Sequence, residues 1–292
     1  MTQLQPPLGF LVQVGLPFVH LGGHSPRGFL IGPGGLYAAL ILDDLGIPYQ
    51  ILEAQNHVGG RLFTYTFPNT TGAPFNYYDV GAMRFPDIVP MRRLFTLFYY
   101  PPLNEGLERP LASLLQTYYF RAADDNAFLS YNGVTVRTND SGPDPFNSEA
   151  VIQDVSTQAA DAYINAGVTN ILHDAFDGFV NGLLNDVETG SDDGWNSLMN
   201  YDGYSTRSYL SLVYTPSAAF QATLPPDQQL PDSPLSTDVV NWCETFDKST
   251  GWYDRSLSET ILEAVAFGNG DPDTPWYCLE FVHCYLFVRI DP

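Results

Sequence analysis

The stretch from Gly28 to Glu53 reads GFLIGPGGLYAALILDDLGIPYQILE and decides the fold of the N-terminal part of the chain. Its apolar residues predict a short strand ending near residue 31, a helix that opens at the glycine turn 32–35, and a buried strand over 47–52. Pro33 suits the first turn of that helix because its missing N–H is not needed there. Strand, helix and strand in this order are typical of a parallel sheet, so the sequence predicts an α/β fold.

The glycines of this turn are spaced as in a dinucleotide-binding site. Such a site needs glycine where the backbone approaches a pyrophosphate, and an acidic residue about 20 positions later that binds a ribose hydroxyl. Gly32 and Gly35 fit the second and third glycines and Glu53 fits the acidic position, but Leu30 stands where the first glycine belongs. On this pattern alone, a nucleotide site and a glycine-rich turn before a core helix are both open.

A second group of motifs narrows the choice. Glu53 and Ala54 are followed by VGGRL at 58–62 and DVGAMRFP at 79–86. In this combination the chain resembles the flavin-containing amine oxidases of the monoamine-oxidase type, and GAMRF is similar to their L-amino-acid oxidase branch. The segments DGYSTRSYL at 202–210 and SETILEAVAFG at 258–268 resemble the same branch.

The resemblance implies FAD as the cofactor and assigns roles to the matching residues. Ten positions are expected to contact FAD: Gly32, Gly34, Gly35, Glu53, Ala54, Gly60, Arg61, Gly81, Ala82 and Met83. The first three line the pyrophosphate at a helix N-terminus, where backbone N–H groups favour anions. Glu53 binds the adenosine ribose, residues 60–61 approach the phosphates or the flavin, and residues 81–83 run beside the flavin ring.

Arg84 is the substrate-binding residue that the resemblance implies. In amino-acid oxidases this position binds the substrate carboxylate as a bidentate fork. Two structural alternatives stay open from the residues alone: Arg84 forms an ion pair with Asp79 or Asp87, and Arg61 caps a turn.

The implied activity is FAD-dependent oxidation of the CH–NH2 group of L-amino acids or amines. Oxygen is the acceptor, and the products are imine or keto acid, ammonia and H2O2. No catalytic acid or base is identified, because this chemistry belongs to the flavin. Two other classes stay open: a non-catalytic remnant, and a different FAD- or NAD-dependent oxidoreductase.

Composition limits the partners. The chain carries 12 basic and 33 acidic residues, a formal net charge of -21, which disfavours nucleic acid as a partner. The three cysteines, Cys243, Cys278 and Cys284, match no metal-ligand spacing. No apolar run is long enough for a transmembrane helix, and the N-terminus makes a poor signal peptide. Composition indicates neither a compartment nor an oligomeric state.

The expected organisation has four parts. They are an irregular leader over 1–27, the N-terminal part of a Rossmann-like FAD-binding domain over 28–148, a mainly helical portion of a substrate domain over 149–280, and a divergent tail over 281–292. Because the likeness fades after Glu280 and Leu30 replaces a family glycine, the resemblance implies an N-terminal fragment. That fragment lacks the C-terminal half of the FAD domain, and we expect no oxidase turnover from it alone.

Local patterns add detail to this plan. Asn132-Gly133 predicts a hairpin turn, and long helix-like periodicity runs over 149–187. Ser256 and Glu259 predict a capping box at the start of a further helix.

Overall fold

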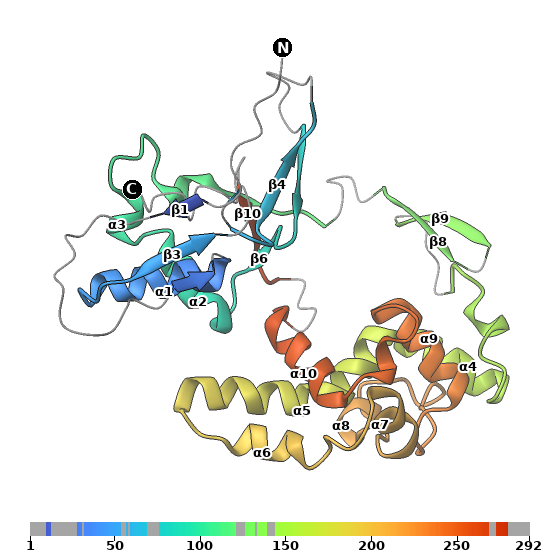
Figure 1. Ribbon diagram of the computed structural model, residues 1–292. Coiled ribbons are helices and arrows are strands. Elements are labelled where there is room, and N and C mark those ends of the chain that lie inside the picture. Colours follow the sequence, from blue (N-terminus) through green and yellow to red (C-terminus); the bar gives the residue numbers. More distant parts are fainter. Residues whose placement is uncertain are drawn as a thin grey trace. The chain divides into compact units, whose positions relative to one another are not determined.

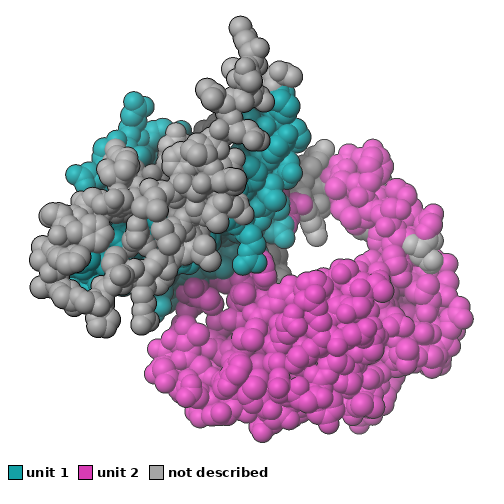
Figure 2. All heavy atoms as spheres, in the orientation of Figure 1, with its two compact units in different colours: residues 1–87, 91–118, 275–292 teal, residues 88–90, 119–274 magenta. Residues whose placement is uncertain are grey.

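The computed structural model describes residues 10–12, 28–30, 32–53, 57, 59–68, 76–120, 126–131, 133–138, 144–268 and 273–279. The chain forms two compact units, coloured separately in Figure 2. Unit 1 comprises residues 1–87, 91–118 and 275–292, and unit 2 comprises residues 88–90 and 119–274. The structure contains both helices and strands, which agrees with the predicted α/β class.

The predicted strand, helix and strand are confirmed in unit 1 (Figure 1). They are β2 (Gly28–Leu30), α1 (Pro33–Asp44) and β3 (Gln50–Glu53). β2 and β3 are parallel, with Leu30 opposite Leu52. β3 starts at Gln50, after Pro48, which has no N–H to donate to a ladder. β1 (Phe10–Val12) pairs antiparallel with β3, in a region where the sequence predicts no regular element.

The remaining strands of unit 1 form two small sheets. β4 (Phe63–Thr66) and β5 (Tyr77–Val80) pair antiparallel. The other sheet has the order β6-β10-β7 and contains β6 (Phe85–Pro86), β7 (Leu115–Thr117) and β10 (Trp276–Leu279). Between β6 and β7 lie η1 (Val89–Met91), α2 (Arg92–Leu97), α3 (Pro101–Asn104) and η2 (Leu111–Leu114). The core of this part consists of Phe85, Phe98, Leu103, Leu111 and Leu279.

Unit 2 begins with a hairpin and continues as helices. The hairpin strands are β8 (Phe128–Tyr131) and β9 (Val134–Arg137), so the predicted hairpin is confirmed, although Asn132 lies outside the described residues. The helices are η4 (Ser148–Ala150), α4 (Thr157–Ala166), α5 (Val168–Thr189), α6 (Asp193–Met199), α7 (Thr206–Leu212), α8 (Ala218–Gln221), α9 (Thr237–Asp247), η5 (Trp252–Asp254) and α10 (Leu257–Ala266). The compact units divide after Tyr118, whereas the composition changes near residue 148.

Two local details of unit 2 differ from the sequence pattern. The periodicity over 149–187 spans two helices, because Gly167 has a φ of 80° and separates α4 from α5. The predicted capping box is wrong: the Ser256 side chain makes no cap hydrogen bond, and Glu259 pairs with Arg255 at 2.7 Å.

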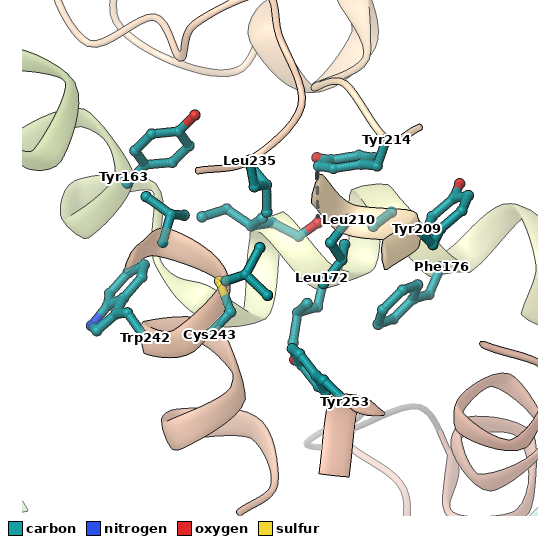
Figure 3. Close-up of a cluster of buried hydrophobic side chains, with 14 of the residues drawn as sticks. Tyr163, Leu172, Phe176, Tyr209, Leu210, Tyr214, Leu235, Trp242, Cys243 and Tyr253 are labelled. Atoms are coloured by element: carbon teal, nitrogen blue, oxygen red, sulfur yellow. Dashed lines mark hydrogen bonds between the residues drawn. The ribbon is translucent and has the colours of Figure 1, made fainter. Parts of the chain in front are cut away.

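The core of unit 2 is rich in buried aromatic side chains (Figure 3). Burial raises the pKa of Tyr163 and of Tyr209 from 10.0 to about 12, so both phenols stay mostly protonated even at pH 10. Cys243 lies fully buried in the same cluster, and burial raises the pKa of its thiol. This thiol is therefore held in its unreactive, protonated form. In the described part of the chain, no helix is both long and apolar enough to cross a bilayer.

Candidate functional site

The glycine turn at the start of α1 leaves room for a ligand. Gly32 is the N-cap with extended backbone, and its carbonyl accepts the Leu36 N–H at 3.1 Å. The first N–H groups of a helix have no intrahelical partner, and the helix dipole favours negative charge there. A Cβ placed on Gly32 or Gly34 would meet no atom of the described residues within 4 Å. Among the described residues, the turn therefore has room for at least a methyl group beside each of these two glycines.

Glu53 lies at the edge of the sheet that carries this turn. It is the last residue of β3, and its strand neighbour β2 ends at Leu30, just before the turn. Because β2 and β3 are parallel, their carboxyl ends meet at one edge, where ligands of open α/β sheets bind. The predicted backbone position of Glu53 is confirmed. Ala54 lies outside the described residues.

A second group forms where the GGR and GAMR segments meet. The hairpin of β4 and β5 places Phe63 opposite Val80, so the residues just outside the hairpin come together. Gly81 has a φ of 127°, and a Cβ on it would lie 2.0 Å from the Arg61 carbonyl oxygen. No larger residue fits this approach without moving the backbone. Gly60 sits in the adjoining turn, which is closed by the Leu62 N–H donating to Gly59 at 2.9 Å.

The segment after Gly81 is exposed. Ala82, Met83 and Arg84 all lie on the surface of unit 1, and 41% of the Met83 side chain is accessible. The next residue, Phe85, is buried in the small core and starts β6. The chain therefore presents three accessible side chains from a backbone that is anchored at both ends.

Arg84 contacts two aromatic rings from other strands. Its guanidinium carbon lies 5.6 Å from the Tyr118 ring centroid and 5.7 Å from the Trp276 ring centroid. Both distances are within the range of cation–π attraction. Tyr118 follows β7 and Trp276 begins β10, so the rings come from segments far from Arg84 in the sequence. No local pattern indicates either ring, and sequence reasoning missed both.

The predicted site residues therefore form three local groups. The first is the glycine turn with Glu53, the second is Gly60, Arg61 and Gly81, and the third is Arg84 with its two rings. Among the hydrogen bonds and ring contacts between described residues, none joins residues 32–35 to the other two groups.

In unit 2 the two motif segments, 202–210 and 258–268, come together. The Thr206 N–H donates to the Arg255 carbonyl and the Leu257 N–H donates to the Tyr204 carbonyl, both at 3.0 Å. The hydroxyls of Thr206 and Thr260 also share a buried hydrogen bond of 2.6 Å.

The lysine of the chain has a structural position. Lys248 lies 3.6 Å from a Glu263 carboxylate oxygen and 4.0 Å from one of Asp247. Glu263 also accepts a hydrogen bond from the Trp252 indole at 3.0 Å. These contacts tie the end of α9 to α10 within unit 2 and give Lys248 a structural role.

Comparison with known proteins supports one family. The profile described as flavin containing amine oxidoreductase matches residues 33–145. L-amino-acid oxidase 4 of Hebeloma cylindrosporum is 43% identical over 260 residues, which cover 85% of this chain and 37% of that protein. The cytotoxic L-amino-acid oxidase of Amanita phalloides is 48% identical over 157 residues, which cover 53% of this chain and 100% of that sequence.

A third relative extends beyond this chain by a larger margin. The putative bifunctional amine oxidase of Dictyostelium discoideum is 34% identical over 256 residues, which cover 86% of this chain and 21% of that protein. The chain thus spans the whole Amanita sequence, but little more than a third of the Hebeloma protein and about a fifth of the Dictyostelium protein.

Proposed function

Because the chain belongs to the flavin-containing amine oxidoreductase family, in its L-amino-acid oxidase branch, we propose that it carries the FAD-binding and carboxylate-binding part of an L-amino-acid oxidase. FAD is the cofactor of this family. The observation that carries the proposal is the arrangement of two neighbouring parallel strands. The glycine turn follows the end of β2, and Glu53 is the last residue of β3, so both lie at the carboxyl ends of these strands. We propose that this edge belongs to a Rossmann-like FAD-binding domain.

The residues present fit the adenosine half of FAD. Gly32, Gly34 and Gly35 would hold the pyrophosphate at the N-terminus of α1, and Glu53 would bind the ribose hydroxyls. Ala54, the next residue in the sequence, would contact the adenosine half of FAD together with Glu53. The openness around Gly32 and Gly34 supports the proposal, because a side chain there would fill the approach of the phosphates.

The second group would lie along the rest of the cofactor. In the proposal Gly60 and Arg61 approach the phosphates or the flavin, and Gly81, Ala82 and Met83 run beside the flavin ring. The close contact between Gly81 and the Arg61 carbonyl supports a shared role, because it fixes the two segments against each other. A planar guanidinium at position 61 would offset pyrophosphate charge by bidentate hydrogen bonds.

The proposed reaction is the oxidation of an L-amino acid by O2. The amino acid is oxidised to the imine, water hydrolyses the imine to a keto acid and ammonia, and O2 is reduced to H2O2. When bound, FAD supplies the redox chemistry, and the protein supplies binding, orientation and electrostatics. Arg84 would orient the substrate through its carboxylate, which simple amines do not have.

A binding experiment tests the substrate class. Calorimetry would compare each L-amino acid of a panel with its decarboxylated amine on the FAD-loaded chain and on Arg84→Ala. Loss of charge-assisted hydrogen bonds worth about 1.5–3 kcal/mol should weaken amino-acid binding about 10- to 150-fold and leave the amines unchanged. Arg92→Ala, which removes another exposed arginine of unit 1, is the matched control. Equal losses for amino acids and amines would assign Arg84 a structural role.

Turnover separates the oxidase proposal from the alternative of a non-catalytic remnant. The sequence predicts that residues 1–292 by themselves release no H2O2, and this stays a prediction. The same motifs predict that the FAD-loaded chain binds L-amino acids. Robust H2O2 release from the chain would contradict the first prediction. The absence of both FAD binding and amino-acid binding would favour the remnant.

A further inference from the structure

We propose that Tyr118 and Trp276 are positioning residues, which hold the guanidinium of Arg84 in the orientation that receives the substrate carboxylate. This inference rests on the proposed role of Arg84. It adds two residues to the site that the family motifs do not include. Neither ring needs to touch the substrate.

The geometry places one cation beside two rings. The distances from the guanidinium carbon of Arg84 to the two ring centroids, 5.6 Å and 5.7 Å, are nearly equal. A guanidinium is planar and weakly hydrated, so it stacks on aromatic faces while its N–H donors stay in its own plane. An arginine beside two aromatic rings can still present a fork of donors to a carboxylate.

The backbone fixes the rings relative to Arg84. The Tyr118 N–H donates to the Trp276 carbonyl at 2.8 Å, which joins the two ring-bearing residues directly. Trp276 lies opposite Pro86 in the ladder between β10 and β6, two residues after Arg84. The Asp87 N–H donates to the Pro275 carbonyl at 2.9 Å and continues that pairing. Tyr118 and Trp276 therefore lie opposite each other, Arg84 directly precedes β6, and all three residues are attached to a single hydrogen-bonded sheet.

The packing beside this sheet end is also well defined. Phe85 and Leu279, which belong to β6 and β10, are buried in the same core. The Tyr277 ring meets the Phe95 ring edge-on at 5.7 Å. Arg84 itself is exposed. A long exposed side chain on a rigid backbone has freedom mainly in its own torsions, and the two rings restrict those torsions.

The two rings are expected to increase the affinity for a carboxylate ligand by pre-organising the Arg84 side chain. Ordering one rotamer-rich side chain on binding weakens affinity by about 2- to 12-fold. Replacing either ring by an aliphatic side chain should raise the dissociation constant for a carboxylate ligand within that range. A smaller ring at the same position should retain most of the effect, because the cation–π attraction needs an aromatic face.

The test uses benzoate as the carboxylate probe and benzylamine as its matched amine, with the FAD-loaded chain. Tyr118→Leu and Trp276→Leu should each weaken benzoate binding about 2- to 12-fold and leave benzylamine binding unchanged. Tyr118→Phe and Trp276→Phe should each bind benzoate more tightly than the leucine variant at the same position and recover most of its loss. Tyr119→Leu is the control, since this neighbouring tyrosine is 78% exposed. Thermal melting of every variant checks the fold.

The outcomes separate this inference from the proposed function. If Arg84→Ala abolishes benzoate binding and the two leucine variants bind benzoate normally, the rings do not position Arg84, while the carboxylate role stands. If phenylalanine fails to rescue a leucine variant, the aromatic face is not the cause and the inference is overturned. If Arg84→Ala and the unsubstituted chain bind benzoate equally, the carboxylate role itself fails, and the inference fails with it.

Discussion

Gly34→Ala separates a cofactor role of the glycine turn from a folding role. Gly34 is exposed in the first turn of α1, and a Cβ there meets no atom within 4 Å in the part of the chain that the structure describes. In the protein alone, alanine should therefore stabilise the helix by about 0.5–1 kcal/mol, because glycine loses more backbone entropy on folding. That gain corresponds to a rise of about 1–6 °C in the thermal midpoint.

The same methyl should weaken FAD binding. If the pyrophosphate contacts the backbone at Gly34, the methyl occupies space that the ligand needs, and overpacking of this kind costs about 1–3 kcal/mol. The dissociation constant for FAD should then rise about 5- to 150-fold. Opposite signs for stability and affinity are the signature of a residue kept small for a ligand.

The assay combines thermal melting without FAD and an FAD titration on the same preparations. Gly178→Ala serves as the control, because Gly178 lies inside α5 in unit 2 and a Cβ there also meets no atom within 4 Å. It should raise stability and leave FAD affinity unchanged. If Gly34→Ala binds FAD as tightly as the unsubstituted chain, the phosphate-binding role of the turn is refuted.

Two further predictions concern unit 2. A Cβ on Gly194 would lie 2.2 Å from the Gly182 carbonyl carbon, so Gly194→Ala should force α6 away from α5 and lower the free energy of unfolding by about 3 kcal/mol in urea titrations. In Gly182→Ala the added Cβ meets the Gly194 Cα at 3.1 Å, so this variant should lose less free energy of unfolding than Gly194→Ala. Equal losses of unfolding free energy in the two variants would contradict this packing. Asp186 accepts hydrogen bonds from the Ser191 hydroxyl and from the Gly194 and Trp195 N–H groups, and these lower its pKa below the ordinary 3.8. A carboxyl group with a lowered pKa stabilises the fold above pH 3.8, and this contribution is lost as pH falls through the folded pKa. The urea midpoint should therefore drop as the pH falls below 3.8, and it should drop less in Asp186→Asn. An identical acid profile in Asp186→Asn would show that another group titrates.

The sequence was sufficient where local patterns determine the structure. The parallel β2 and β3 with α1 between them follow from apolar runs separated by Gly32–Gly35 and Gly46. The hairpin of β8 and β9 likewise follows from a two-residue turn with glycine. In each case the deciding residues are close together in the chain, so that short-range sterics and hydrogen bonding are enough.

The sequence was insufficient where distant segments meet. The rings beside Arg84 depend on the register of β10 with β6 and β7, which join residues near 85, 116 and 277. Helix boundaries were also missed, because apolar periodicity does not register the break at Gly167. The capping box failed because Glu259 pairs with Arg255, a competing partner outside the motif.

The most direct test of the central claim is a competition titration of FAD binding to the chain. If the turn at residues 32–35 and Glu53 bind the adenosine half of FAD, ADP should displace FAD, whereas FMN, which lacks the adenosine, should not. Glu53→Gln should weaken the binding of FAD and of ADP by a similar factor, because both carry the ribose. No saturable FAD binding, or displacement by FMN but not by ADP, would contradict the account.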